Sequence, residues 1–493
     1  MGCDRAYDRK GGIGVTVEKL KHIKNIRVLL FGDFMVDKYI YGKVTRISPE
    51  APVPVLQVTK KQIKLGGAGN VVNNIMTLGA KVRALGCIGQ DADGEWIISE
   101  LEENGIETGY IQQFSRVKTI SKTRLVAKNQ QFLRYDEEKI EAIPEEYIAY
   151  MEMNKAAIFQ NIQVVIISDY GKGAVTEESA QLLISYANEK GIPVIIDPKG
   201  KDYGKYAGAY ACTPNVKELS DVIGHELITE ENLAAAGQEV KKSARIKSLV
   251  LTRSEKGITL FDDAGNKKDF PAISKDVVDV TGAGDTVVCV VALMLVAGFS
   301  MEECCVLANI AASIVCSKFG AATVSLNELM EQIVNSGEFK LVDVTTARYV
   351  LDSLREKGKK IVFTNGCFDM LHAGHLASFL QARKYGDVLM AAVNSDESVR
   401  RLKGETRPVI NQNDRIAMLC ALECVDYVIL MEDDTPVNLI KALKPDVTVK
   451  GRDWENKYLP EREVVESYGG EVRFIDLEEG LSTTNIIRKI MNE

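Results

Sequence analysis

Short runs of consecutive apolar residues, many of them β-branched, recur along the chain, and stretches with helical spacing of apolar positions separate most of them. A strand that is covered on both faces is apolar at every position, as strands in a parallel sheet are. The pattern therefore predicts an α/β fold in which helices cover parallel sheets. The expected strands are residues 26–31, 164–168, 194–197, 248–252, 361–364, 388–393 and 447–449.

Two segments depart from this pattern. Residues 38–58 contain three prolines, and residues 116–135 mix charged and hydroxyl side chains with apolar ones. Both are typical of exposed strands, so we expect a small antiparallel sheet appended to the first large one. The pattern loosens over residues 326–345 before a new β–α run begins. We therefore expect an N-terminal extension (1–24), a first domain (25–325), a linker (326–345) and a second domain (346–493).

The composition narrows the functional classes. The 493 residues include 61 Lys and Arg and 69 Asp and Glu, a net charge of −8, which argues against a protein that coats nucleic acid. No apolar run is long enough to cross a membrane, and the charged N-terminus lacks a secretory signal. The ten cysteines form no C-x-x-C pair, which favours reduced thiols. We expect a cytoplasmic protein that binds neither nucleic acid nor membrane.

A first candidate site lies in the segment DVTGAGD (279–285), which precedes a long apolar helix. Backbone N–H groups of Gly282, Ala283 and Gly284 can bind an anion at the helix N-terminus. Asp285 in the first turn can accept a proton from a substrate hydroxyl while those groups hold a transferring phosphoryl group. On spacing alone, an ordinary helix start with turn glycines explains the segment equally well.

Further segments carry a family resemblance: GD (32–33), GGAGN (66–70), PNVKE (214–218) and TRSEKG (252–257). Together with DVTGAGD they resemble the ribokinase-like carbohydrate kinases over about residues 25–325. The resemblance implies an α/β sandwich with a small β lid, which often forms a dimer contact. It makes Asp285 the catalytic base and assigns sugar contacts to Asp33, Gly66, Gly67 and Asn70. It assigns nucleotide contacts to Asn215, Glu218, Thr252, Gly257, Gly282, Ala283, Gly284 and Asn309, with Asn215 and Glu218 helping to place Mg²⁺. A polar strand end for Asp33 and a solvated helix face for Glu218 are the alternatives.

A second candidate site is the segment FTNGCFDMLHAGH (363–375), between an expected strand and an expected helix. Gly374 allows a phosphate to approach the backbone, and His372 and His375 can both donate to that phosphate. A zinc site that uses Cys367 with the two histidines lacks a fourth ligand and a standard spacing. We therefore expect no directly ligated metal here.

His-x-Gly-His after a strand resembles the cytidylyltransferase-like nucleotidyltransferases, and the resemblance covers about residues 345–493. It implies a Rossmann-like domain with a parallel sheet, in which His372 and His375 are catalytic. A sugar phosphate oxygen would attack the α-phosphorus of a nucleoside triphosphate, and pyrophosphate would leave. The implied nucleotide contacts are Thr364, Gly374, Lys403, Arg407, Ser482, Thr483 and Thr484. For Lys403 and Arg407, a solvated basic surface is the alternative.

Nearly the whole chain, through segments such as GDFMVDKYIYG, ISDYGKGAV and VNSDESVRRLKGETRPV, resembles the bifunctional heptose 7-phosphate kinases and heptose 1-phosphate adenylyltransferases. That family makes ADP-heptose for the lipopolysaccharide core. The resemblance implies ATP at both sites, Mg²⁺, D-glycero-β-D-manno-heptose as the sugar, and a homodimer through the lid strands. Two alternatives stay open: another sugar phosphate or CTP as substrate, or one half as an inactive binding module.

Overall fold

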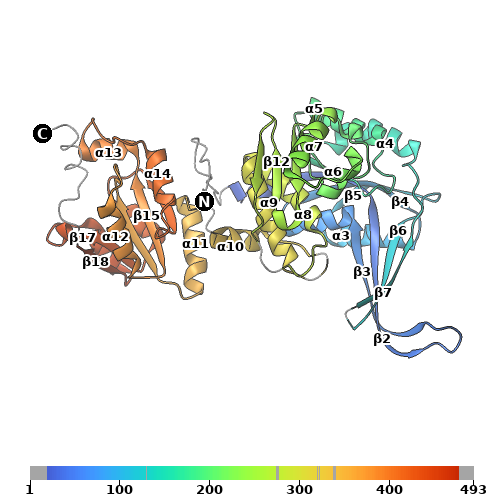
Figure 1. Cartoon of the computed structure of the whole chain (residues 1–493), viewed down its shortest axis with the longest axis horizontal. Helices are drawn as coiled ribbons and strands as arrows, with labels where there is room; N and C mark the ends of the chain where they lie inside the picture. The colour runs from blue at the N-terminus through green and yellow to red at the C-terminus, as the bar shows by residue number, and fades with distance from the viewer. Residues whose placement is uncertain are drawn as a thin grey trace. The chain divides into compact units, whose positions relative to one another are not determined.

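The computed structural model describes residues 19–20, 22–128, 130–273, 277–318, 320, 322–336 and 340–476. The chain divides into two compact units, one formed by residues 22–329 and one that includes residues 330–476 (Figure 1). The stretch expected as a linker includes helix α10 (Leu326–Ser336) and the start of α11 (Val344–Glu356). Among the described residues, no helix combines the length and the apolar character that crossing a membrane requires.

A nine-stranded sheet organises the first unit, in the order β13-β12-β11-β10-β9-β8-β1-β4-β5. From β5 to β11 neighbouring strands are parallel, and β12 and β13 form an antiparallel edge. The strands expected at 164–168, 194–197 and 248–252 are confirmed as β8, β9 and β11. The bounds are β1 (Arg27–Gly32), β4 (Lys81–Gly89), β5 (Glu107–Phe114), β8 (Val164–Ser168), β9 (Val194–Asp197), β10 (Ala211–Cys212), β11 (Ser248–Thr252), β12 (Ile258–Phe261) and β13 (Lys267–Phe270).

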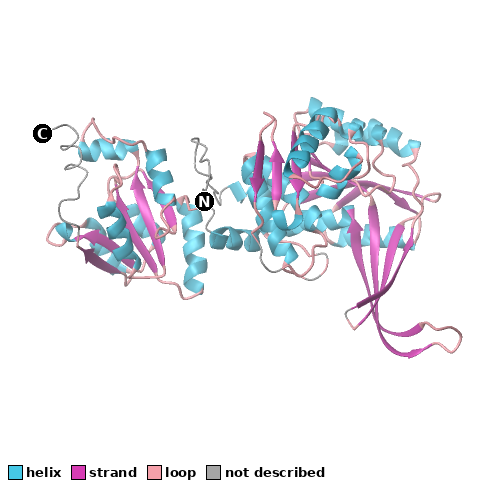
Figure 2. Ribbon diagram, viewed as in Figure 1, coloured by secondary structure: helices cyan, strands magenta, loops and turns pink. Residues whose placement is uncertain are grey.

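Helices cover both faces of this sheet (Figure 2). On one face α4, α5 and α7 pack on alternate strand residues such as Leu29 and Phe31, which are fully buried. On the other face α2 and α8 contact each other, and α8 contacts β8, β9 and α9. The helices are α2 (Ala68–Thr77), α3 (Ala92–Glu103), α4 (Glu145–Ile158), α5 (Glu177–Glu189), α6 (Val216–Ile223), α7 (Glu230–Ser243), α8 (Ala283–Val296) and α9 (Met301–Cys316), with short 3₁₀ turns η1 (His22–Asn25), η2 (Gly204–Tyr206) and η3 (Ser254–Lys256).

The lid is a separate four-stranded sheet in the order β3-β2-β6-β7, with β2 (Phe34–Ile47), β3 (Pro54–Gly67), β6 (Ile120–Ala127) and β7 (Gln130–Glu137). The expected small sheet is present, but the expectation of purely antiparallel pairing is wrong, because β2 and β6 are parallel. The reason lies in the connections. Strand β2 follows β1 after one residue and β6 follows β5 after a short turn, so both leave parallel strands at their carboxyl ends.

The second unit contains a five-stranded, fully parallel sheet in the order β16-β15-β14-β17-β18. The strands expected at 361–364, 388–393 and 447–449 are confirmed and extend one or two residues further. Helices α11, α15 and α16 pack on one face, and α12 and α14 pack on the other. The bounds are β14 (Ile361–Gly366), α12 (Ala373–Arg383), β15 (Val388–Asn394), α13 (Asp396–Lys403), α14 (Gln412–Cys420), β16 (Tyr427–Met431), α15 (Val437–Leu443), β17 (Val447–Gly451), η4 (Arg452–Trp454), α16 (Pro460–Ser467) and β18 (Glu471–Ile475).

Candidate active sites

Asp285 lies in the first turn of α8 and is only 8% exposed. Helix α8 begins after Gly282, whose φ of 85° is in the left-handed region that favours glycine. The Tyr170 hydroxyl donates to Oδ1 of Asp285 at 2.6 Å, and the Asn70 amide donates to Oδ2. Burial raises the pKa of Asp285, while these two hydrogen bonds lower it. The carboxylate is thus positioned from both sides at a helix N-terminus.

The glycine-rich turn before α2 places Asn70 beside Asp285. Gly67 has a φ of 57°, and an added Cβ there would lie 2.3 Å from the Asp33 carbonyl oxygen. A Cβ on Gly66 would lie 2.5 Å from a carboxylate oxygen of Asp37. Gly67 therefore requires glycine, and at Gly66 the chain passes close to the Asp37 side chain. The turn places Asn70 against Asp285, while Gly66 and Gly67 lie next to Asp37 and Asp33; the contact of all three residues with a sugar stays a prediction.

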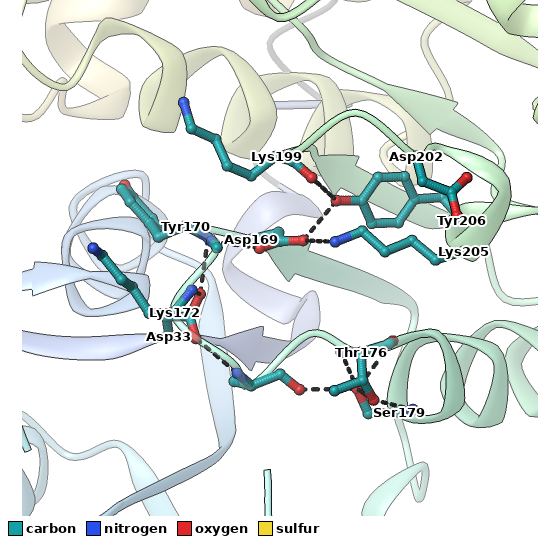
Figure 3. A network of polar contacts seen from close by, with 12 residues as sticks. Asp33, Asp169, Tyr170, Lys172, Thr176, Ser179, Lys199, Asp202, Lys205 and Tyr206 are labelled. Carbon is teal, nitrogen blue, oxygen red and sulfur yellow. Dashed lines mark hydrogen bonds and ion pairs between the residues drawn. The ribbon is translucent and has the colours of Figure 1, made fainter. Parts of the chain in front are cut away.

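Asp33 has different neighbours from those expected of a free sugar ligand. Its carboxylate is 4% exposed and accepts three backbone N–H groups, from Tyr170 at 2.9 Å, Lys172 at 3.1 Å and Ala174 at 2.9 Å (Figure 3). Burial raises the pKa of Asp33, and the three backbone hydrogen bonds oppose that change. Asp33 therefore fixes the segment 170–174 in this structure, and a sugar contact for it stays a prediction.

Sequence reasoning missed a group of charged residues on the lid strands. Asp37 on β2 forms an ion pair with Arg124 on β6, and its charge raises the pKa of Asp285. Lys122, the register partner of Asp37, has its Nζ 6.0 Å from the centroid of the Tyr170 ring. The signal was available: Asp37 and Tyr39, like Lys122 and Arg124, are spaced by two, so each pair shares one face of its strand.

The side chain of Lys122 has no ion pair or hydrogen bond among the residues that the structure describes. Burial and the positive charges of Lys172 and Arg134 lower its pKa, although Asp37 opposes this. Lys172 is itself paired with Glu138 at 2.5 Å. Arg134 likewise has a carboxylate partner, so Lys122 is the cation of this group that has none in the described structure, as a site for an anion requires.

The predicted nucleotide contacts of the first unit have structural partners of their own. Asn215 and Glu218 form a reciprocal cap at the start of α6, each accepting a backbone N–H of the other at 2.9 Å. Asn309 donates to the Pro271 carbonyl at 2.6 Å. Thr252 forms a bridge with Asn215, and Gly257 has a φ of 85° in the turn before β12. Their contact with a nucleotide stays a prediction.

One carboxyl group shows that the Glu218 cap and Asp285 lie close together. Asp197 ends β9, and its pKa is raised well above the ordinary value by burial and by the charges of Asp285 and Glu218. Lys199, which follows, pairs with Glu218 at 2.9 Å. The carboxyl end of the sheet therefore brings the predicted phosphate-placing residues toward the predicted base.

The two histidines of the second unit meet at the start of α12. His372 precedes the helix and His375 lies in its first turn, with ring centroids 4.0 Å apart. Burial lowers the pKa of His372, and burial with the charges of His372 and Lys403 lowers that of His375 to about 4. Both Nδ1 atoms are buried without a hydrogen-bond partner in the described part of the chain. At neutral pH the pair is therefore uncharged, and Lys403 faces it.

The other residues predicted for this site differ in their environment. Gly374 is buried in the first turn of α12, and Thr364 on β14 donates to the Val449 carbonyl at 3.3 Å. Arg407 pairs with the buried Asp369, whose other oxygen accepts the backbone N–H of Val409 at 2.6 Å. Arg407 thus anchors its own loop, and its guanidinium is already paired, unlike that of an arginine that is free to bind a phosphate. Ser482, Thr483 and Thr484 lie outside the described residues.

Arg415 on α14 is a second residue that sequence reasoning missed. Its guanidinium is fully buried and donates to the carbonyls of Cys367 at 2.5 Å and Asn394 at 2.7 Å and to the Asp396 carboxylate at 2.6 Å. Cys367 follows β14, Asn394 ends β15 and Asp396 comes just after it, so Arg415 holds together the edge that carries the histidines. Within the described ranges, no group of three or more His, Cys, Asp or Glu side chains is placed to hold a metal ion.

Comparison with known proteins assigns a family to each unit and to the whole chain. The PfkB family of carbohydrate kinases matches residues 25–328, and the cytidylyltransferase-like family matches residues 363–489. The chain is 43% identical to the bifunctional protein HldE of Syntrophotalea carbinolica over 479 residues, which cover 96% of this chain and 97% of that protein. The chain belongs to the HldE family. HldE of Geobacter sulfurreducens is 42% identical, with 97% of this chain and 98% of that protein covered. The protein is therefore a bifunctional transferase that joins a carbohydrate kinase to a nucleotidyltransferase.

Solved structures confirm the predicted ribokinase-like fold of the first unit. Phosphofructokinase-2 from Escherichia coli in complex with potassium matches with a TM-score of 0.54 and 22% identity, over 63% of this chain and 99% of that one. Ribokinase from Arabidopsis thaliana complexed with ribose and ATP matches with a TM-score of 0.50 and 20% identity, over 62% of this chain and 98% of that one.

Proposed function

We propose that this enzyme phosphorylates D-glycero-β-D-manno-heptose 7-phosphate at the anomeric C1 hydroxyl with ATP, and separately transfers AMP from ATP to heptose 1-phosphate. The second reaction gives ADP-heptose and releases pyrophosphate. One observation carries the proposal: a single chain of the HldE family holds both a buried carboxylate and a histidine pair, each at a helix N-terminus at the carboxyl edge of a parallel sheet.

In the first reaction Asp285 takes the proton of the C1 hydroxyl as its oxygen attacks the γ-phosphorus of ATP. The N–H groups of Gly282, Ala283 and Gly284 at the start of α8 would hold the transferring phosphoryl group, with the Ala283 N–H released from the Val280 carbonyl that it bonds at 3.3 Å. Each Asp285 oxygen accepts one hydrogen bond in the structure and keeps a second lone pair for the hydroxyl. Burial raises the pKa of Asp285, which makes it a stronger base than an exposed aspartate.

The cations beside Asp285 favour a sugar that already carries a phosphate. Lys122 lies over Tyr170, whose hydroxyl reaches the base, and Lys172 and Arg134 add positive charge around Lys122. A phosphate placed there would pair with the Lys122 ammonium, which has no carboxylate partner in the described structure. Gly66, Gly67 and Asn70 would contact the sugar hydroxyls nearer to Asp285, as the family resemblance implies.

In the second reaction the attacking sugar phosphate oxygen is already anionic, so positioning and charge neutralisation suffice. Neutral imidazoles of His372 and His375 donate N–H groups to a phosphate at the start of α12, and Lys403 supplies positive charge next to them. Arg407 and the Ser482–Thr484 segment complete the proposed triphosphate site. Binding of a triphosphate would raise the depressed pKa of His375.

Mg²⁺ and dimer formation belong to the same proposal. The Glu218 carboxylate is bonded to Asn215 and Lys199, so it would hold Mg²⁺ through water and the ATP phosphates, where the ion neutralises charge.

The lid exposes apolar side chains that a second copy could cover. They are Val53, Val58, Ile63, Phe132, Leu133 and Tyr135. We propose a cytoplasmic location for the enzyme, because both reactions consume ATP.

Product analysis by mass spectrometry tests the proposal. The full chain is incubated with heptose 7-phosphate, ATP and Mg²⁺, and a bisphosphate is expected. It is then incubated with heptose 1-phosphate and either ATP or CTP, and ADP-heptose is expected from ATP alone. A CDP-sugar, or a bisphosphate formed better from another sugar phosphate, would replace the substrate assignment. ATP binding without turnover at one site would make that half a binding module.

A further inference from the structure

Tyr170 links the predicted base to the rest of the kinase site. It follows β8, and its hydroxyl donates to Oδ1 of Asp285 at 2.6 Å across 115 residues of sequence. Burial and the neighbouring charge of Asp285 raise the pKa of Tyr170 well above its ordinary value, so the hydroxyl stays protonated and acts as the donor. With Asn70 on the other oxygen, the plane of the carboxylate is fixed.

The backbone around Tyr170 is held from two sides. Asp33 accepts the N–H groups of Tyr170, Lys172 and Ala174. Asp169 accepts the Gly171 N–H at 2.6 Å, and its other oxygen bonds the Tyr206 hydroxyl at 2.6 Å (Figure 3). Two buried carboxylates therefore fix a short segment whose only side chain bonded to Asp285 is Tyr170, within the described structure.

We propose that Tyr170 is a positioning residue for Asp285 in the kinase reaction, and that Asp33 acts through Tyr170 by fixing the segment 170–174. The inference rests on the proposed kinase function. It gives Asp33 a role different from the sugar contact that the family resemblance implies. A carboxylate rotates freely about χ2 unless its oxygens are bonded, and small errors in the direction of a base are costly to catalysis.

Several ionisable groups lie near Asp285 or Tyr170 and remain in any Tyr170 variant. Asp37 on β2 faces it and is paired with Arg124 on β6, and Lys122 lies over the Tyr170 ring. From the sheet side, the Asp197 carboxyl ends β9 next to Lys199, and the Cys289 thiol lies on α8 itself. Substituting Tyr170 alone therefore isolates the effect of one hydrogen bond.

The first test compares the wild type with Tyr170→Phe, both as the full chain. The pH dependence of kcat/KM for the kinase reaction is measured with the sugar phosphate and Mg-ATP. The lost hydrogen bond stabilised the charged carboxylate, so the acidic limb should move up by about one to two pH units, and kcat should fall by about tenfold to a hundredfold. Tyr147→Phe is the matched control, because its buried hydroxyl bonds the Tyr110 carbonyl at 2.8 Å, away from Asp285. If the acidic limb of the pH profile of Tyr170→Phe coincides with that of the wild type, the proposal is overturned, even if kcat falls.

Asp33→Asn tests the second half of the proposal. Its amide nitrogen cannot accept the backbone N–H groups, so kcat should fall and the acidic limb should move up, with the KM of the sugar phosphate nearly unchanged. A raised KM with kcat and the limb unchanged would make Asp33 a sugar ligand and overturn its positioning role. Turnover of heptose 7-phosphate by the wild type tests the proposed function separately. The comparison of pH profiles can use any sugar phosphate that the wild-type kinase accepts, so it does not depend on that result.

Discussion

Asn70 and Asp285 are 215 positions apart in the sequence, yet the amide of Asn70 donates a hydrogen bond to the Asp285 carboxylate. Asn70 opens α2 and Asp285 opens α8, and the two helices pack against each other on one face of the sheet. The glycine turn and the anion-binding turn therefore meet at one point.

Asp285→Asn should abolish sugar phosphorylation and leave ATP affinity near normal. Asparagine has nearly the same shape but cannot take the proton, so the rate should fall by about 10²–10⁴-fold. Coupled measurement of ADP release and titration of ATP binding check the two parts. The same variant should still form ADP-sugar from sugar 1-phosphate. Normal phosphorylation by this variant would remove Asp285 as the base.

His372→Ala and His375→Ala should each cripple pyrophosphate release while kinase activity persists. Each substitution removes one of two neutral donors whose rings lie 4.0 Å apart at the start of α12. A pyrophosphate assay gives the rate, and elemental analysis of the purified wild type and variants gives the metal content. Stoichiometric zinc that disappears in the variants would restore the rejected metal site.

His375 should also make the second unit sensitive to acid. Its pKa of about 4 in the folded state lies below the ordinary 6.5. Between these values the unfolded chain binds more protons than the folded one, so the free energy of unfolding falls as the pH is lowered from 6.5 to about 4. In His375→Gln this loss should be smaller. Urea unfolding across the pH window measures both slopes, and equal slopes would contradict the depressed pKa.

Lys122→Met should weaken binding of the sugar phosphate. Methionine keeps the length of the side chain but loses the charge, so the KM for the phosphorylated sugar should rise by about tenfold to a hundredfold. The unphosphorylated sugar, if it reacts at all, should be affected much less. Lys60→Met is the matched control, since this lid lysine lies 5.8 Å from the ring of Tyr41. Equal losses for both sugars would place the phosphate elsewhere.

The two units should work as independent enzymes. Each has its own sheet, its own helix N-terminus and its own charged groups. A cut between residues 336 and 340 keeps α10 whole and keeps Leu341, which bridges to Val428, with the second fragment. Kinase and nucleotidyl-transfer assays on the separate fragments should each find activity. Well-folded fragments that regain activity only when mixed would show that one unit completes the other's site.

The sequence predicted the central strands well because complete burial on both faces leaves a simple signal. Residues 164–167, 194–196 and 249–251 are unbroken apolar runs, and each lies in a strand that has the bounds expected from the sequence. The lid was harder. Its strands were expected, but which neighbours run parallel depends on where each strand leaves the main sheet, and the composition of β2 and β6 carries no record of that.

The site residues were likewise predictable only where the sequence carries a local signal. Motifs with fixed spacing led to Asp285, His372 and His375, because the chemistry depends on neighbours within a few residues. Tyr170 and Arg415 were missed, since their importance comes from partners far along the chain. Arg415 lies on a helix with polar neighbours, where an arginine usually faces solvent, and only the fold reveals that it is fully buried.

The connection between β1 and β2 has a consequence for the order of events in the kinase. β1 ends at Gly32 and β2 begins at Phe34, so Asp33 alone joins the main sheet to this lid strand. Rotation of β2 about that point changes the backbone angles of the residue whose carboxylate holds the Tyr170 segment. A bound sugar phosphate that rotated β2 would therefore also shift the Tyr170 segment, and capture of the substrate and alignment of Asp285 would then occur together.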